Sequence, residues 1–460
     1  MQSDTLSTAL GKRISWKKCE NRVLIQFEKG EGTIEILRND IINVFVPYET
    51  KEHRSKAIEG KKTVPAEYTV TEEGDALAIS TDALTAKVYD NLLIDFYKAD
   101  GTLLCADYRG KRTVGDAIDE EYLEMLRAEG HDVSDMSSRD HRIQVVKAMD
   151  GDEKFYGLGD KTGFLNKRDY EYENWNSDIP QAHNEDYRAL YKSIPFLITL
   201  KKQGVFGMFF DNTYKSYVNL GKENQNYYFY GVENGNLDYY FIVGDKMTDV
   251  VSGYTYLTGT TPMPQRWTLG YHQSRWGYEN ADDIRDVAEH YRNLQIPCDT
   301  IHFDIDYMDG YRVFTWNEEA FGAPGEIIKE IGKSGYHAVT IIDPGVKLDE
   351  GYYMYDEGIA GGYFAKDKDG QVYVNEVWPG EAVYPDYGNP KTREWWAEKQ
   401  KYLTDLGVSG VWNDMNEPAS FRGELPLDVA FTDEDRPITH AEMHNIYGCL
   451  LYTSDAADEG

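Results

Sequence analysis

The chain has 460 residues, of which 41% are hydrophobic and 13% aromatic, so we expect two or more folded domains and not general disorder. Its 80 acidic and 48 basic side chains give a formal net charge of −32. So acidic a surface repels phosphate backbones and anionic lipid, which argues against nucleic-acid and membrane partners, whereas neutral sugars are not repelled.

The N-terminal residues, the apolar runs and the cysteines indicate the cellular compartment. Met1 to Thr5 contain neither a basic nor an apolar stretch, so we expect no signal peptide, and no apolar run approaches the length of a membrane span. The four cysteines are scattered without CxxC pairs, which favours free thiols and a cytoplasmic protein. We find no sequence support for a metal, expect no cofactor, and read no oligomeric state from the pattern.

Short alternating apolar runs separated by turn signals fill the chain from about residue 13 to 256. Helical periodicity is scarce there, apart from residues 119–128. Many strands with turns at this spacing are typical of a β-sandwich, which we expect over residues 1–262. The proline-rich joint Thr260-Thr-Pro-Met-Pro264 is taken as the end of this domain.

Strand and helix patterns alternate after that joint, which predicts a parallel sheet with helical crossovers. No glycine-rich phosphate fingerprint follows a strand, which disfavours a Rossmann-type sheet. We therefore expect residues 263–448 to form the first half of a (β/α)8 TIM barrel, about four strand–helix units, with an insertion at about 345–390. The expected strands are 267–274, 298–306, 337–343 and 408–412; the expected helices are the segment between Asn280 and Pro297, 320–334, 392–406 and 438–447; a hairpin is expected at 367–370.

Residues 449–460 do not continue the last helix convincingly. Their composition resembles translated adaptor sequence more than protein. We interpret them as a non-native tail on a C-terminally truncated chain.

Carboxylates stand at the ends of three successive strands: Asp304 and Asp306, then Asp343, then Asp414. Barrel enzymes keep their catalytic groups at this end of parallel strands. Asp414 follows Trp412, and a carboxylate beside a flat aromatic ring suits attack on an oxocarbenium-like sugar centre. The competing interpretation is that Asp414 caps a helical turn.

Five segments, in this order, resemble the retaining α-glucosidases of glycoside hydrolase family 31. They cover most of the chain from about residue 150 to 448. The segments are Phe155-Tyr-Gly-Leu-Gly-Asp-Lys-Thr-Gly163, Leu190-Tyr-Lys-Ser-Ile-Pro-Phe196, Asp304-Ile-Asp-Tyr-Met-Asp-Gly-Tyr-Arg-Val-Phe-Thr315, Gly410-Val-Trp-Asn-Asp-Met-Asn-Glu-Pro418 and His440-Ala-Glu-Met-His-Asn-Ile-Tyr-Gly448.

The resemblance implies a galactose-mutarotase-like sandwich, a catalytic barrel and a set of site residues. Asp414 would be the nucleophile, and Asp304 would hold the hydroxyls of the sugar before the scissile bond. Asp178 would lie on a loop that the sandwich sends into the barrel mouth. The residues implied to shape the sugar subsite are Trp276, Ile305, Ile341, Trp378, Trp412 and Met415.

Substrate and activity follow from the same resemblance. Ile305-Asp306-Tyr307 is similar to the glucosidases, whereas related α-xylosidases have Cys-Phe-Trp there, so we expect terminal α-linked glucose of an oligosaccharide as the substrate. The family's acid/base Asp would lie beyond residue 460, so we expect residues 1–460 alone to be inactive. The alternatives are an α-xylosidase or another α-glycosidase of the family, or a non-catalytic carbohydrate-binding scaffold.

Other polar residues keep two interpretations each. Asp306 and Asp304, two apart on a strand, point the same way, and Asp306 is either an internal ion-pair partner or functional. Asp343 either binds sugar or bonds a neighbouring strand. Glu417 either orients Asp414 or caps a helix N-terminus. His440 and His444 lack the glutamate of a zinc motif and are expected to be packing residues.

Overall fold

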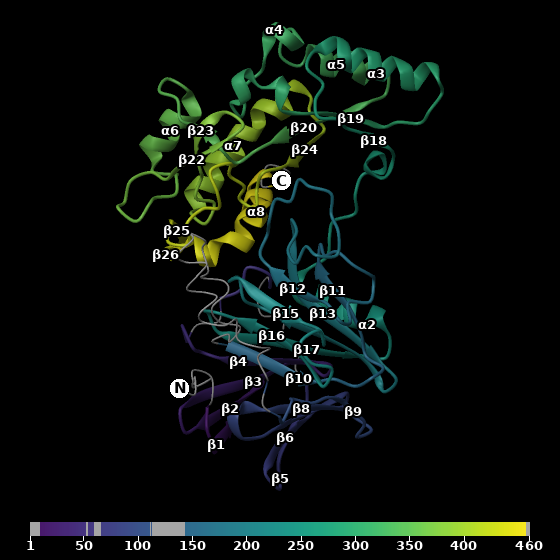
Figure 1. The fold of residues 1–460 in the computed structure, drawn as a ribbon, viewed down its shortest axis with the longest axis vertical. Helices are drawn as coiled ribbons and strands as arrows, with labels where there is room; N and C mark the ends of the chain where they lie inside the picture. The colour runs from purple at the N-terminus through teal and green to yellow at the C-terminus, as the bar shows by residue number, and fades with distance from the viewer. Residues whose placement is uncertain (1–9, 52–53, 59–65, 111, 113–142, 457–460) are drawn as a thin grey trace, which may run out of the picture. The chain divides into compact units, whose positions relative to one another are not determined.

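The computed structural model describes residues 10–51, 54–58, 66–110, 112 and 143–456. The chain divides into two compact units, Met1–Thr260 and Thr261–Gly460 (Figure 1). The helix expected at 119–128 lies outside the described residues, as do the first residues of the chain and the last four. No described helix is long and apolar enough to cross a membrane.

The N-terminal unit is a β-sandwich, as the alternating pattern predicts. An eight-stranded antiparallel sheet has the order β1-β2-β3-β4-β17-β14-β13-β11, and it faces sheets of order β10-β16-β15-β12 and β5-β6-β7-β8-β9. The strands are β1 Arg13–Lys18, β2 Arg22–Phe27, β3 Gly30–Arg38, β4 Ile41–Val46, β5 Thr69–Glu73, β6 Ala76–Ser80, β7 Leu84–Val88, β8 Ile94–Lys98, β9 Leu103–Cys105, β10 Ile143–Ala148, β11 Lys154–Gly159, β12 Glu171–Asn174, β13 Ser193–Lys201, β14 Gly204–Phe210, β15 Ser216–Asn219, β16 Tyr227–Val232 and β17 Leu237–Gly244; a 3-10 turn, η1, spans Asp90–Leu92.

Aromatic pairs join the layers of this sandwich. Phe96 of β8 stacks on Phe241 of β17, with ring centroids 3.8 Å apart, and Phe210 of β14 stacks on Tyr230 of β16 at 4.0 Å. The opposite face of the large sheet is covered by α2, Met247–Thr258, which buries Val250. The strand-rich pattern did not predict this helix. Its β-branched and aromatic residues favour strands locally, and packing against the sheet decides its conformation.

The C-terminal unit is built on four parallel strands in the order β18-β19-β20-β24 (Figure 1). They are β18 His272–Gln273, β19 Thr300–Phe303, β20 His337–Ile342 and β24 Gly410–Asn413. Ile342 pairs with Asn413, so β20 and β24 end together, whereas Phe303 at the end of β19 pairs with Thr340, two residues before the end of β20. The strand expected at 267–274 is mostly irregular, because Arg266–Leu269 forms a 3-10 turn, η2, and Trp267 stacks on His337 at 4.3 Å.

Helices connect and cover these strands, and α3 and α5 lie side by side (Figure 1). Asn280 caps α3, accepting hydrogen bonds from the backbone of Asp282 and Asp283, as predicted. The helix expected at 320–334 is broken in two at Gly322–Gly325, a stretch that contains Pro324. The helices are α3 Ala281–Asn293, α4 Glu318–Phe321, α5 Glu326–Lys333, α6 Tyr353–Gly361, α7 Pro390–Leu406 and α8 His440–Ala456, with 3-10 turns η3 Ile305–Tyr307 and η4 Asp309–Tyr311.

The excursion between β20 and α7 folds as its own small sheet, with the order β21-β23-β22. The hairpin expected at 367–370 is present, closed by a bridge between Lys366 and Val372. A second hairpin, β25–β26, precedes α8. The expectation for the last helix was wrong at both ends, because Ile438 belongs to β26 and α8 continues to Ala456. The strands are β21 Val346–Lys347, β22 Val374–Val377, β23 Gly380–Val383, β25 Ala430–Asp433 and β26 Arg436–Thr439.

Candidate active site

Three carboxylates meet at one edge of the parallel sheet. Asp304 follows β19, Asp343 follows β20 and Asp414 follows β24. The backbone N–H of Asp414 donates to the carbonyl of Ile342 at 3.3 Å, which continues the β20–β24 ladder by one step. Because neighbouring strands are about 4.8 Å apart, Asp343 and Asp414 emerge side by side from adjacent strands. The edge is the carboxyl end of the sheet, where barrel enzymes place their chemistry.

Burial makes this edge electrostatically unusual. Asp304 is 7% exposed, and its pKa is raised by burial and by the charges of Asp414 and Asp306, although its own hydrogen bond from Ile305 N at 2.7 Å opposes the shift. Asp343 is 4% exposed, and its pKa is raised well above the ordinary value by burial and then by the charges of Asp414, Asp304 and Glu417. Ionisation of one of these carboxyls therefore raises the pKa of its neighbours, so their titrations are linked.

One expectation about the carboxylates was wrong, and one of the two interpretations of Glu417 is excluded. β19 ends at Phe303, so Asp304 and Asp306 do not lie on one strand; Asp306 belongs to η3 and accepts a hydrogen bond from the Tyr311 hydroxyl at 3.3 Å. Glu417 caps no helix, because the residues after β24 form turns and the next helix begins at His440. It is 6% exposed and contributes to the charge around Asp343.

An aromatic row lies in the same unit. The rings of Trp276 and Trp378 are 5.8 Å apart, and Phe421 meets Trp378 edge to face at 5.1 Å. These side chains are 72%, 37% and 49% exposed, respectively, so their faces are open to a ligand. Sequence reasoning missed Phe421. Its position three residues after Pro418 was the only local signal, and its neighbour Trp378 comes from the insertion.

The remaining apolar site candidates are mostly enclosed. Ile305 and Ile341 are 3% and 2% exposed and belong to the main hydrophobic core of the unit. Met415 is 7% exposed and packs with Val377 of β22. Trp412, on β24, is partly buried, and its ring meets His302 edge to face at 5.9 Å. Trp412 thus presents more surface to a ligand than the other three.

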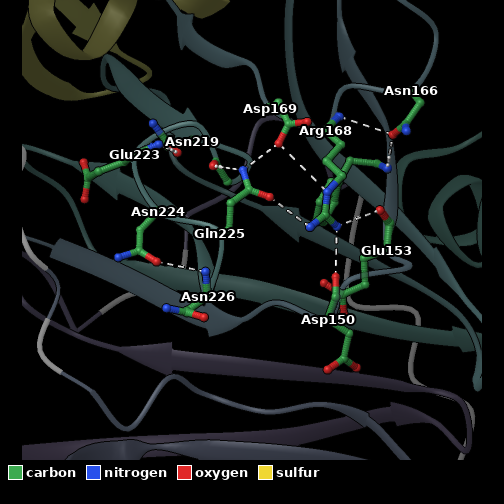
Figure 2. A network of polar contacts seen from close by, with 12 residues as sticks. Asp150, Glu153, Asn166, Arg168, Asp169, Asn219, Glu223, Asn224, Gln225 and Asn226 are labelled. Carbon is green, nitrogen blue, oxygen red and sulfur yellow. Dashed lines mark hydrogen bonds and ion pairs between the residues drawn. The ribbon is translucent and has the colours of Figure 1, made fainter.

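Asp178 lies on the exposed loop between β12 and β13 of the N-terminal unit. The loop closes on itself where Asn176 accepts a hydrogen bond from Ser193 N at 2.8 Å. Just before β12, Arg168 donates to the carbonyls of Asp150 and Glu153 at 2.9 and 3.1 Å (Figure 2). These contacts hold the segment from which the loop departs, and the role of Asp178 in the site stays a prediction.

His440 and His444, four residues apart on one helix, are a polar pair with metal-ligand chemistry. No group of three or more His, Cys, Asp or Glu residues in the described part of the chain is arranged to hold a metal ion. His440 and His444 are 1% and 3% exposed, and His444 Nδ1 is 2.9 Å from His440 Nε2. His440 Nδ1 faces the carbonyl of Leu425 at 3.0 Å, so it carries a proton, and His440 Nε2 accepts from His444. Both rings are thus enclosed and hydrogen-bonded within the C-terminal unit.

Comparison with known proteins decides the family. Residues 261–458 match the profile of the glycosyl hydrolases family 31 TIM-barrel domain, and residues 31–219 match the glycosyl hydrolase 31 N-terminal galactose mutarotase-like domain. The chain belongs to glycoside hydrolase family 31. The resemblance drawn from the five sequence segments is confirmed, and so is the fold class of a sandwich followed by barrel strands.

Relatives of this family 31 chain include alpha-glucosidase 2 of Bacillus thermoamyloliquefaciens, which is 44% identical over 311 residues, covering 67% of this chain and 39% of that protein. Neutral alpha-glucosidase AB of Dictyostelium discoideum is 32% identical over 62% of this chain and 31% of its own length. The chain thus spans well under two thirds of these relatives. A Flavobacterium johnsoniae family 31 dextranase, solved with glucose, superimposes with a TM-score of 0.84 at 27% identity, covering 97% of this chain and 52% of that one.

Proposed function

We propose that this family 31 chain carries the nucleophile of an exo-acting retaining α-glucosidase, which releases terminal α-linked glucose from oligosaccharides by double displacement. The observation that carries the proposal is the position of Asp414 at the carboxyl edge of β24, beside the enclosed carboxyls of Asp304 and Asp343. Neutral sugars need carboxylates for paired hydrogen bonds and open aromatic faces for stacking, and this unit offers both.

In the first displacement, a carboxylate oxygen of Asp414 bonds to the anomeric carbon as the bond to the leaving oxygen breaks. Water then cleaves the glycosyl ester and restores Asp414. Asp304 binds sugar hydroxyls with the oxygen that does not accept from Ile305 N. Glu417, enclosed behind the strand ends, helps to orient Asp414. The mechanism also uses a protonated carboxyl that serves the leaving oxygen, and we assign no residue to that role.

The preference for glucose is supported by the relatives. Two proteins similar to this chain are named as alpha-glucosidases, and the similar dextranase was solved with glucose. A family 31 alpha-xylosidase from a soil metagenome is also similar in fold, with a TM-score of 0.76, but its 20% identity carries no inference about substrate. Ile305-Asp306-Tyr307 favours glucose over xylose, as argued from the sequence.

A mechanism-based inhibitor tests the proposal directly. We expect 5-fluoro-α-D-glucosyl fluoride to add one fluoroglucosyl group to the chain, located on the peptide that contains Asp414 by mass spectrometry. Fluoride departs readily, so the experiment reports on the nucleophile with little demand on the general acid. Asp414→Asn should abolish labelling, whereas Asp309→Asn, at a side chain that is 69% exposed, should label normally. The xylosyl analogue should label more slowly.

Three results would contradict the proposal. A label on a side chain other than Asp414 would remove the assigned nucleophile. Faster labelling by the xylosyl analogue would move the preference from glucosidase to xylosidase. Binding of glucose to both the original chain and Asp414→Asn, without labelling of either, would favour a non-catalytic carbohydrate-binding scaffold.

A further inference from the structure

Asp343 is the most enclosed carboxyl at the carboxyl edge of the sheet, and nothing in the proposed chemistry uses it. It is 4% exposed, and its Oδ1 is buried without a hydrogen-bond partner among the described residues. From the sequence, Asp343 either binds sugar or bonds a neighbouring strand. Its side chain exposes less surface than that of Asp304, and its Oδ1 is fully enclosed, so we consider a role inside the site in place of direct sugar binding.

The charges that face Asp343 are all negative in the part of the chain that the structure describes. Asp414 and Glu417 approach from the segment after β24, and Asp304 approaches from the start of η3. Tyr307 of η3 is the other titratable neighbour, but its hydroxyl donates to the carbonyl of Ile341 at 2.8 Å. An ionised Asp343 would therefore be a buried charge among like charges with no cation opposite, which is a costly arrangement.

A neutral carboxyl removes that cost and changes its hydrogen-bonding role. An ionised carboxylate only accepts hydrogen bonds, whereas the protonated acid also donates one through its O–H. The acceptor is indicated by the strand register: Ile342 pairs with Asn413, and the next residues along the two strands are Asp343 and Asp414. Of the three neighbouring carboxylates, Asp414 raises the pKa of Asp343 most, after burial itself.

We infer that Asp343 is a positioning residue: it remains a neutral carboxylic acid and donates a hydrogen bond to the carboxylate of Asp414. The inference rests on the proposed function of Asp414. The hydrogen bond orients the nucleophile toward the anomeric carbon, and it keeps Asp414 ionised by stabilising its charged form. An ionised Asp343 would instead raise the pKa of Asp414 and favour its protonation.

Labelling kinetics with 5-fluoro-α-D-glucosyl fluoride separate this role from sugar binding. Asp343→Asn keeps an N–H donor without a titrating group, so its maximal labelling rate should stay within about threefold of the original chain. Asp343→Ala lacks the donor, so its maximal rate should fall on the order of tenfold while the half-saturating inhibitor concentration stays unchanged. Asp386→Asn, at another enclosed carboxyl of the same unit, is the matched control and should label normally.

The pH profile of labelling gives a second readout. The labelling rate should fall at acidic pH as Asp414 becomes protonated. In Asp343→Ala, which lacks the donor, Asp414 is protonated more easily, so this acidic limb of the rate profile should move to higher pH. In Asp343→Asn the limb should stay in place. If Asp343 were ionised, Asp343→Asn would remove a negative charge and move the limb to lower pH, which overturns the inference. A rise in the half-saturating concentration at an unchanged maximal rate would also overturn it, in favour of sugar binding.

Infrared difference spectroscopy tests the protonation state without any reaction. The spectrum of the original chain minus that of Asp343→Asn at neutral pH should contain the C=O stretch of a protonated carboxyl; a carboxylate band in its place would refute the neutral state. Failure of the proposed function is distinguishable, because then the original chain is not labelled at Asp414 at all.

Discussion

Trp396 offers a direct test of how the C-terminal unit is held together. It lies on α7, is completely buried, and meets Phe314 and Tyr387 edge to face, at ring distances of 5.0 and 5.3 Å. Tyr387 in turn contacts Tyr447 of α8 at 5.1 Å. The indole therefore connects α7 to the segment after η4 and to the end of the insertion, and through Tyr387 it is linked to α8.

Trp396→Ala should lower the free energy of unfolding of this unit by about 3–5 kcal/mol. Three ring pairs are lost, with Phe314, Tyr387 and the adjacent Trp395 at 6.0 Å. Each is worth about 0.5–1.5 kcal/mol and supplies part of that loss, and the unfilled space supplies the rest. For a unit of about this length, 1 kcal/mol corresponds to roughly 2–4 °C, so the midpoint of its thermal transition should fall by roughly 6–20 °C.

Thermal unfolding followed by circular dichroism is the assay, with two internal comparisons. The N-terminal unit has a hydrophobic core of its own, so we expect its transition to stay where it is. Trp276→Ala makes the same substitution at a side chain that is 72% exposed and should change stability by less than about 0.5 kcal/mol. Equal shifts for the two tryptophans, or a shift below about 2 °C for Trp396→Ala, would refute the packing argument.

Two further stability predictions follow from buried charge. Lys147 is completely buried and pairs with Asp107 at 2.8 Å, so Lys147→Met should lower the free energy of unfolding in urea by about 3–5 kcal/mol. Arg285→Met, at an exposed ion pair, is the control and should lower it by less than about 1 kcal/mol. Similar losses for the two variants would contradict the role of burial. Burial lowers the pKa of His440 from 6.5 to about 4, so on acidification the unfolded chain binds the proton before the folded chain does. The free energy of unfolding should therefore fall by up to about 3 kcal/mol as the pH drops from about 6.5 toward 4. His440→Gln should flatten this part of the pH dependence, and an unchanged slope in the variant would assign it to other groups.

Much of the fold was readable from local sequence. Alternating runs predicted the sandwich, because strands such as β2 bury one face and expose the other, although β14 and β16 are buried on both faces. Asn280 and the apolar stripe after it predicted α3, because a cap and a helical period are both local properties. The sequence also placed Asp414 directly after a strand, as the structure has it, although the four residues of β24 are only half-buried. These features are set by residues within a few positions of one another.

Tertiary packing decided what the sequence could not. α2 is a helix because the large sheet covers one of its faces, and β18 is short because Trp267 turns to stack on His337. Trp378 and Phe421 are 43 positions apart in the chain, and only the folding of the insertion makes them neighbours. The surroundings of Asp343 arise in the same way: three strand ends and a turn bring the carboxyls together, and burial and Coulomb repulsion then act on distances in space, which residue order alone does not contain.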